Sequence, residues 1–216
     1  MFGKLREPVS GLTHLLGAIL SIVALVVLSV ASLSRNNIYN FISFGIFGIS
    51  LILLYSASTI YHLSWFSQKS IKVLQHIDHS MIYVLIAGSY TPICLIALKG
   101  KLGISILFII WLMAILGILV KNFWFNAPRW LSTAFYIIMG WFIIIAIFPL
   151  SKVLPIGGMW WLVSGGVAYT IGGIIYGTKW PKIPFKNFSF HETFHLFVLL
   201  GSFFHFMLMY NFILNM

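Results

Sequence analysis

Hydrophobic residues run through this chain in seven long stretches separated by short polar breaks. A helix that crosses a bilayer needs about 20 consecutive apolar residues. The pattern therefore predicts an all-α membrane protein with seven transmembrane helices. We expect these helices at residues 12–33, 39–63, 78–98, 102–120, 130–150, 157–178 and 190–213. The breaks are too short to fold separately, so residues 1–216 are expected to form one integral-membrane domain, with any chemistry inside the bundle or at its rim.

The first stretch has a second interpretation. Lys4 and Arg6 precede an apolar run from Leu15 to Val30, and a secretory signal peptide has the same layout. The run continues to Leu33, which favours a spanning helix. Cleavage of a signal there would leave six helices.

Composition agrees with a membrane protein. Hydrophobic residues make up 61% of the chain and charged residues 7%, whereas soluble domains have about 25% charged residues. The net charge of +10 comes from basic residues scattered through the polar breaks. This distribution suits lipid headgroups and argues against nucleic acid as a partner. The single cysteine, Cys94, excludes an intramolecular disulfide and a cysteine-based zinc knuckle.

The distribution of lysine and arginine predicts the orientation, because cytoplasmic loops carry more of them. In the predicted topology nine of the 13 lie on one side and four on the other. The first side holds Lys4, Arg6, Lys69, Lys72, Lys121, Arg129, Lys179, Lys182 and Lys186, and the second holds Arg35, Lys99, Lys101 and Lys152. We therefore expect a multi-pass protein of the cell membrane, with the N-terminus in the cytoplasm and the C-terminus outside.

This topology places three histidines and an aspartate at one depth. His62 ends the second predicted helix, Asp78 begins the third, and His191 and His195 lie in the first turns of the seventh. With a rise of about 1.5 Å per residue, all four lie in a shallow layer near the cytoplasmic face. Residues four apart share a helix face. Ionisable or metal-binding side chains inside a bilayer are costly and usually functional, so the group predicts a metal site.

Zinc suits this group best. Three neutral imidazoles with an open fourth position form a known catalytic zinc arrangement, which lowers the pKa of bound water to about 7. Asp78 would balance charge, contact the metal through water or act as a general base. Ser58 lies four residues before His62 on the same helix face, where its hydroxyl could bond to the water or to a substrate carbonyl. Three imidazoles also suit other divalent ions.

The remaining histidines are expected to have other roles. His14 begins the first helix and is predicted to line the same cavity. His76 and His79 flank Asp78 but point away from it, so they are expected to anchor the helix at the interface. His205 lies ten residues beyond His195, about 15 Å deeper, and is expected to make a buried hydrogen bond between helices. Glu192 lies off the histidine face and is expected to pair with a lysine.

The chain resembles the hemolysin III group of the PAQR family, which includes the adiponectin and progestin receptors. The motifs are Ser58 to His62, His76 to His79 continued by Ala87 to Pro92, and His191 to His195. The resemblance covers all seven segments and implies seven helices with the N-terminus inside. It also implies that His62, His191 and His195 ligate zinc, that Asp78 contacts it through water, and that Ser58 lines the site.

The chain departs from the family pattern near its start. The family's first motif has an acid, an Asn three residues later and a His four residues beyond. Glu7 and His14 keep this spacing, but Ser10 replaces the Asn. The role of this motif is therefore open. Glu7 is expected to pair with Arg6 or a loop lysine, or to cap the mouth of the bundle.

Two classes of function remain. The resemblance to ceramidase-like relatives favours a zinc-dependent hydrolase that cleaves a lipid amide or ester, with membrane lipids as substrate. The alternative is a non-enzymatic sensor, membrane-homeostasis or hemolysin-like protein with a structural zinc. A proton-coupled transporter is a third hypothesis. The sequence specifies neither the substrate nor the oligomeric state.

Overall fold

The computed structural model describes residues 5–35, 37–124, 128–182 and 188–216, and within them every element is helical. Seven helical spans are long and apolar enough to cross a membrane. The elements are α1 (Pro8–Leu33), α2 (Ile38–Leu63), α3 (Gln68–Pro92) with η2 (Ile93–Leu98), α4 (Gly100–Phe123), α5 (Arg129–Trp141) with η3 (Phe142–Ala146) and α6 (Ile147–Val153), α7 (Ile156–Thr178), and α8 (Phe190–Asn211) with η4 (Ile213–Asn215). The predicted all-α, seven-helix fold is confirmed.

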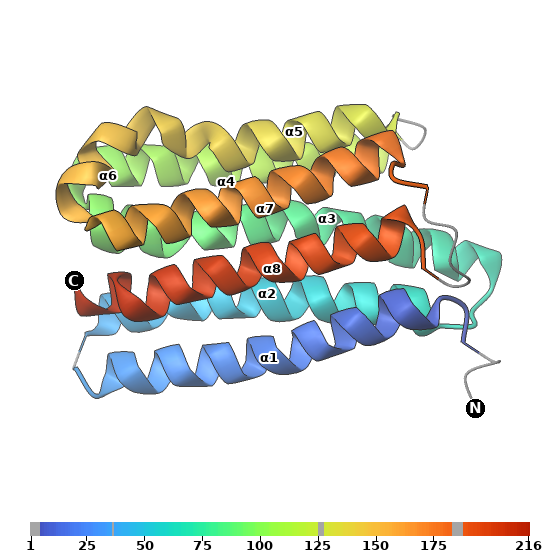
Figure 1. The fold of residues 1–216 in the computed structure, drawn as a ribbon, viewed down its shortest axis with the longest axis horizontal. Helices are drawn as coiled ribbons and strands as arrows, with labels where there is room; N and C mark the ends of the chain where they lie inside the picture. Colours follow the sequence, from blue (N-terminus) through green and yellow to red (C-terminus); the bar gives the residue numbers. More distant parts are fainter. Residues whose placement is uncertain (1–4, 36, 125–127, 183–187) are drawn as a thin grey trace.

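The helices lie side by side along the long axis of the molecule (Figure 1). Helix α1 packs mainly against α2 and also touches α8, while α7 packs closely against α8. Helix α1 therefore joins the second span to the last one. The C-terminus lies at the end of the bundle opposite to the start of α1 (Figure 1).

Helix α3 begins ten residues earlier than expected, at Gln68 instead of residue 78. Ser67 caps its start by accepting a hydrogen bond from the backbone N–H of Ser70, at 3.3 Å. The first turns carry exposed polar residues such as Lys69 and Lys72. Hydropathy finds only the apolar part of a span, so the sequence pattern does not reveal this largely polar extension. Asp78 consequently lies about three turns inside α3 and not at its start.

Two spans depart from a regular α-helix, each near a proline. Pro92 lacks an N–H and crowds the preceding turn, and α3 passes directly after it into the π-helical segment η2. In the fifth span, a 3₁₀ segment that ends three residues before Pro149 separates α5 from α6. The Tyr90 hydroxyl stabilises this break by bonding to the carbonyls of Met139 and Gly140 and the N–H of Ile143, each at 2.8 Å.

Large apolar side chains cover the outside of the bundle. Leu16, Val30, Phe108 and Phe148 are each more than half exposed in the isolated chain. Apolar surface of this extent is rare on soluble monomers but suits contact with lipid. The chain is a multi-pass membrane protein. Lys4 and Lys186, which contributed to the charge count, lie outside the described residues.

Candidate metal centre

Three histidine rings meet at one end of the bundle. His62 lies in the last turn of α2, and His191 and His195 lie in the first two turns of α8. One ring nitrogen from each lies within 4.8 Å of the other two. The side chains of His62 and His195 are almost completely buried. The structure thus brings together the three residues that the sequence placed at one depth.

The spacing of the nitrogens suits a small tetrahedral ion. The Nε2 atoms of His62 and His191 are 3.3 Å apart. Two nitrogens that each lie about 2.0–2.1 Å from a tetrahedral zinc are separated by about 3.3 Å. This donor set of imidazoles alone is one that zinc accepts readily. The three residues could therefore hold a metal ion.

Glu7 fixes the orientation of the His62 ring. The Nδ1–H of His62 donates to the Glu7 carboxylate, which leaves Nε2 directed toward the other histidines. The backbone N–H of Glu7 also donates to the His62 carbonyl, at 3.1 Å. The hydrogen bond from His62 and the charge of Arg6, 3.7 Å away, lower the pKa of Glu7. A carboxylate behind a ligating imidazole is a common feature of protein zinc sites.

The His195 ring is oriented in a similar way by the backbone of α1. Its Nδ1–H donates to the carbonyl of Ser10, at 3.2 Å, so Nε2 remains free to bind a ligand. On the other side, the ring of His14 stacks on it, with centroids 3.6 Å apart. His14 also lines the adjacent cavity, as predicted. Neither nitrogen of His14 has a hydrogen-bond partner among the described residues.

Glu192 stabilises the start of α8. Its carboxylate accepts hydrogen bonds from the N–H and hydroxyl of Ser189, at 2.7 and 2.6 Å, which completes a capping box. The other oxygen accepts from the Ser10 hydroxyl at 2.6 Å. The predicted pairing of Glu192 with a lysine stays a prediction, because Lys186, the lysine just before α8, lies outside the described residues. Through these bonds Ser10 links α1 to the helix that carries two of the three histidines.

Asp78 and Ser58 line a cavity that begins beside the histidines. Asp78 is 8% exposed and Ser58 is 1% exposed. The Ser58 hydroxyl lies next to the Asp78 carboxylate, so the two side chains form one polar group beside the histidines. Asp78, despite lying further along α3 than expected, does face the site.

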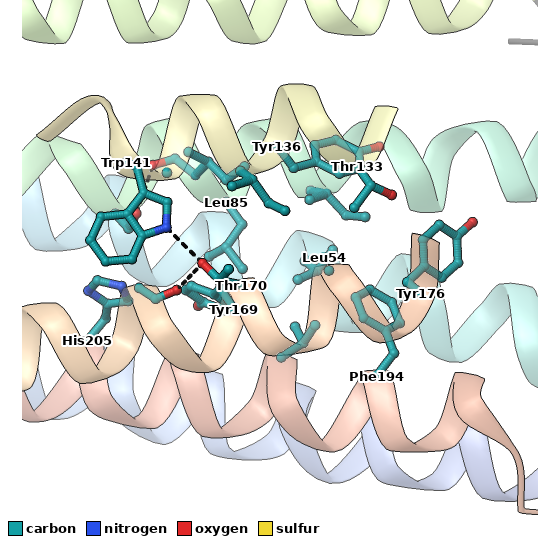
Figure 2. Close-up of a pocket in the computed structure, with 18 of the residues that line it drawn as sticks. Leu54, Leu85, Thr133, Tyr136, Trp141, Tyr169, Thr170, Tyr176, Phe194 and His205 are labelled. Carbon is teal, nitrogen blue, oxygen red and sulfur yellow. Dashed lines mark hydrogen bonds between the residues drawn. The ribbon is translucent and has the colours of Figure 1, made fainter. Parts of the chain in front are cut away.

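The cavity itself is elongated and mostly apolar. Helices α3, α5, α7 and α8 supply most of its walls. On α8 the lining runs from His191 to His205, which corresponds to about 21 Å along the helix. Figure 2 shows Tyr176 and Phe194 toward one end and His205 and Trp141 toward the other. Its length and lining suit a single hydrocarbon chain.

Two predictions about the other histidines are corrected. His79 lines the cavity instead of anchoring the interface, and its Nε2 lies 3.3 Å from the hydroxyl of Tyr176. His205 is buried as predicted, but its Nδ1 has no hydrogen-bond partner among the described residues. The ring stacks on Tyr169 instead, with centroids 5.4 Å apart.

The sequence reasoning missed the contacts that Glu7 and Ser10 make with the histidines. A signal for them was present, since Glu7, Ser10 and His14 are spaced three and four residues apart and so share one helix face. Of the three roles expected for Glu7, the pairing with Arg6 is confirmed. The spacing could not reveal which helix this face contacts.

Comparison with known proteins finds a family and relatives that match nearly the whole chain. The protein family described as Haemolysin-III related matches residues 2–206. A hemolysin-3 homolog of Bacillus subtilis (strain 168) is 43% identical over 202 residues, covering 94% of this chain and 92% of that protein. Hemolysin-3 of Bacillus cereus is 42% identical over 196 residues, covering 91% and 86%.

Proposed function

The chain belongs to the haemolysin-III related family, and from that premise we propose that it is a zinc-dependent hydrolase that cleaves a lipid amide or ester within the membrane. One observation carries the proposal. Three converging imidazole nitrogens lie beside a buried carboxylate at the end of a long apolar cavity. A zinc ion that only links helices needs no such cavity. Hydrolysis of a lipid needs both the metal-binding group and the apolar cavity.

The cavity supports a lipid as substrate. An acyl chain would occupy the apolar part between α3, α5, α7 and α8, which places the scissile carbonyl near His191 and His195. Burial of the chain in this cavity would fix the carbonyl beside the polar groups. Such positioning removes much of the entropic cost of the reaction.

Each residue around the scissile carbonyl has its own role in the proposed hydrolysis. A zinc ion held by the three histidines polarises a carbonyl and lowers the pKa of a nearby water molecule. Asp78 takes the proton from the attacking water and then returns it to the leaving amine or alcohol. Ser58, which lines the cavity beside Asp78, donates a hydrogen bond to the carbonyl oxygen. Glu7 and Ser10 hold the imidazoles in position.

Metal analysis combined with lipid hydrolysis tests the proposal. Purified protein should contain about one zinc per chain and release fatty acid from ceramide or a lipid ester. His191→Ala should lose both the metal and the activity, because it removes a ligand. Asp78→Asn should keep the metal but lose activity by about 10²- to 10⁴-fold, the usual effect of removing a general base. Zinc binding with no turnover of any amide or ester lipid would contradict the hydrolase.

The names of the relatives support a second candidate. Both curated relatives are called hemolysin-3, which suggests membrane perturbation, with the zinc as a structural clip. Among the described residues that line the cavity, Asp78 is the one carboxylate, and neither lysine nor arginine occurs, which disfavours a conducting pore. Leakage of dye from vesicles separates the candidates. If Asp78→Asn causes as much leakage as wild type, and neither protein hydrolyses lipid, the result favours this second function.

A further inference from the structure

The far end of the cavity contains a histidine that the proposed chemistry does not use. His205 lies ten residues after His195 on α8, about 15 Å away along the helix. It is 7% exposed and lines the cavity. Its Nδ1 has no hydrogen-bond partner among the described residues. A buried polar group without a partner is destabilising, so a role in ligand binding would explain its presence.

The other polar groups near His205 already have partners. The Trp141 indole N–H donates to the Thr170 hydroxyl at 2.8 Å, as Figure 2 shows. The hydroxyl of Tyr169 bonds to Ser202 at 2.9 Å. The Tyr90 hydroxyl bonds to the backbone of the fifth span. Among the described residues at this end, His205 is thus the group with hydrogen-bonding capacity to spare.

The position of the His205 ring is closely defined by α7. One face stacks on Tyr169, at an interplanar angle of 19°. Its edge lies against Gly165, where an added Cβ would fall 2.7 Å from Nε2. Gly165 thus makes room for an imidazole at this level. A side chain held this way offers a hydrogen bond in a fixed place, as a binding subsite requires.

The spacing defines the ligand. A zigzag chain with carbon–carbon bonds of about 1.5 Å spans about 15 Å in about twelve bonds. We propose that His205 forms a second polar subsite, which selects lipid chains that carry a hydroxyl group about twelve carbons from the carbonyl. A hydroxyl both donates and accepts, so it matches an imidazole in either tautomer. This inference rests on the proposed function, because it takes the carbonyl to lie at the histidine triad.

Displacement of radiolabelled octadecanoic acid from zinc-loaded protein in lipid nanodiscs tests the subsite without any need for turnover. The competitors are octadecanoic acid, 12-hydroxyoctadecanoic acid and 6-hydroxyoctadecanoic acid. In 6-hydroxyoctadecanoic acid the hydroxyl group would lie against the apolar walls of the cavity and out of reach of His205. Wild type should bind the 12-hydroxy acid about five- to tenfold more tightly than the other two, the factor expected for one buried hydrogen bond.

Two variants connect that preference to His205. His205→Phe keeps an aromatic ring against Tyr169 and should remove the preference while still binding octadecanoic acid. His205→Gln keeps a donor and an acceptor and should retain part of it. Thermal unfolding of both variants shows that each is folded. Equal binding of the three acids by wild type, or a preference that survives in His205→Phe, would overturn the subsite alone. Failure of every acid to bind would overturn the proposed lipid substrate as well.

Discussion

At the scale of single residues, the partners of the imidazoles decide which nitrogen faces the site. His62 donates from Nδ1 to the Glu7 carboxylate, and His195 donates from Nδ1 to the Ser10 carbonyl. Both bonds leave Nε2 as the free nitrogen. An imidazole held in one tautomer and one orientation binds a metal without further ordering. Helix α1 therefore contributes no member of the triad, yet it prepares two of the three histidines for metal binding.

Replacing Glu7 tests this positioning role. Glu7→Gln keeps the size of the side chain but removes the negative charge behind His62. Affinity for zinc should fall about 10- to 100-fold, as is typical for loss of such a partner. Competition with a chromogenic chelator measures the affinity. Glu192→Gln is the matched control, because that carboxylate bonds to serines and not to a histidine of the triad. Equal affinities in wild type and Glu7→Gln would contradict the role.

At the scale of elements, the proposed ion would join two helices that share little direct contact. Helices α2 and α8 both pack against α1 but make few backbone contacts with each other. Apart from the histidines, the hydroxyl of Tyr55 connects them among the described residues, through hydrogen bonds of 2.6 Å to Ser202 and 3.3 Å to the Val198 carbonyl. A zinc ion between His62 and the two histidines of α8 would therefore act as a cross-link.

Removal of the metal should consequently destabilise the bundle. A ligand present at about 1,000 times its dissociation constant stabilises a folded protein by about 4 kcal/mol. A strong chelator should thus lower the thermal midpoint of purified wild type by several degrees, and added zinc should restore it. In His62→Ala the chelator should have little effect, since the site is already broken. A midpoint that does not respond to chelation in wild type would count against the cross-link.

At the scale of the whole molecule, the arrangement of the spans places the triad at one end of the bundle. Its side of the membrane follows from the lysine and arginine distribution, which predicts the cytoplasm. The metal centre and the exposed lysines at the start of α3 would then share one compartment. Any polar product released there would enter the cytoplasm.

Cysteine labelling tests this orientation. Ser70, near the start of α3, and Ser151, near the end of the fifth span, are both exposed. The native Cys94 is buried and free, so it should give little background. In intact cells a membrane-impermeant maleimide should label Ser151→Cys and not Ser70→Cys, and lysis should make both reactive. Labelling of Ser70→Cys alone in intact cells would reverse the topology.

The sequence by itself determined the seven spans and the common depth of His62, His191 and His195. Both follow from distances along the chain, because bilayer thickness sets the length of a span and the helical rise sets the depth of a residue. The exception at the element level was α3, whose first ten residues mix six polar or charged side chains with four apolar ones and so gave no clear hydropathy signal.

Only the tertiary structure decided which groups meet around the histidines. The rotation of each helix and the choice of its neighbour depend on packing between side chains, which a count along one helix does not contain. For that reason Glu7 and Ser10 emerged as partners of the triad, Glu192 proved to cap α8, and His79 turned toward the cavity. The same packing left His205 buried beside Gly165 without a partner for its Nδ1.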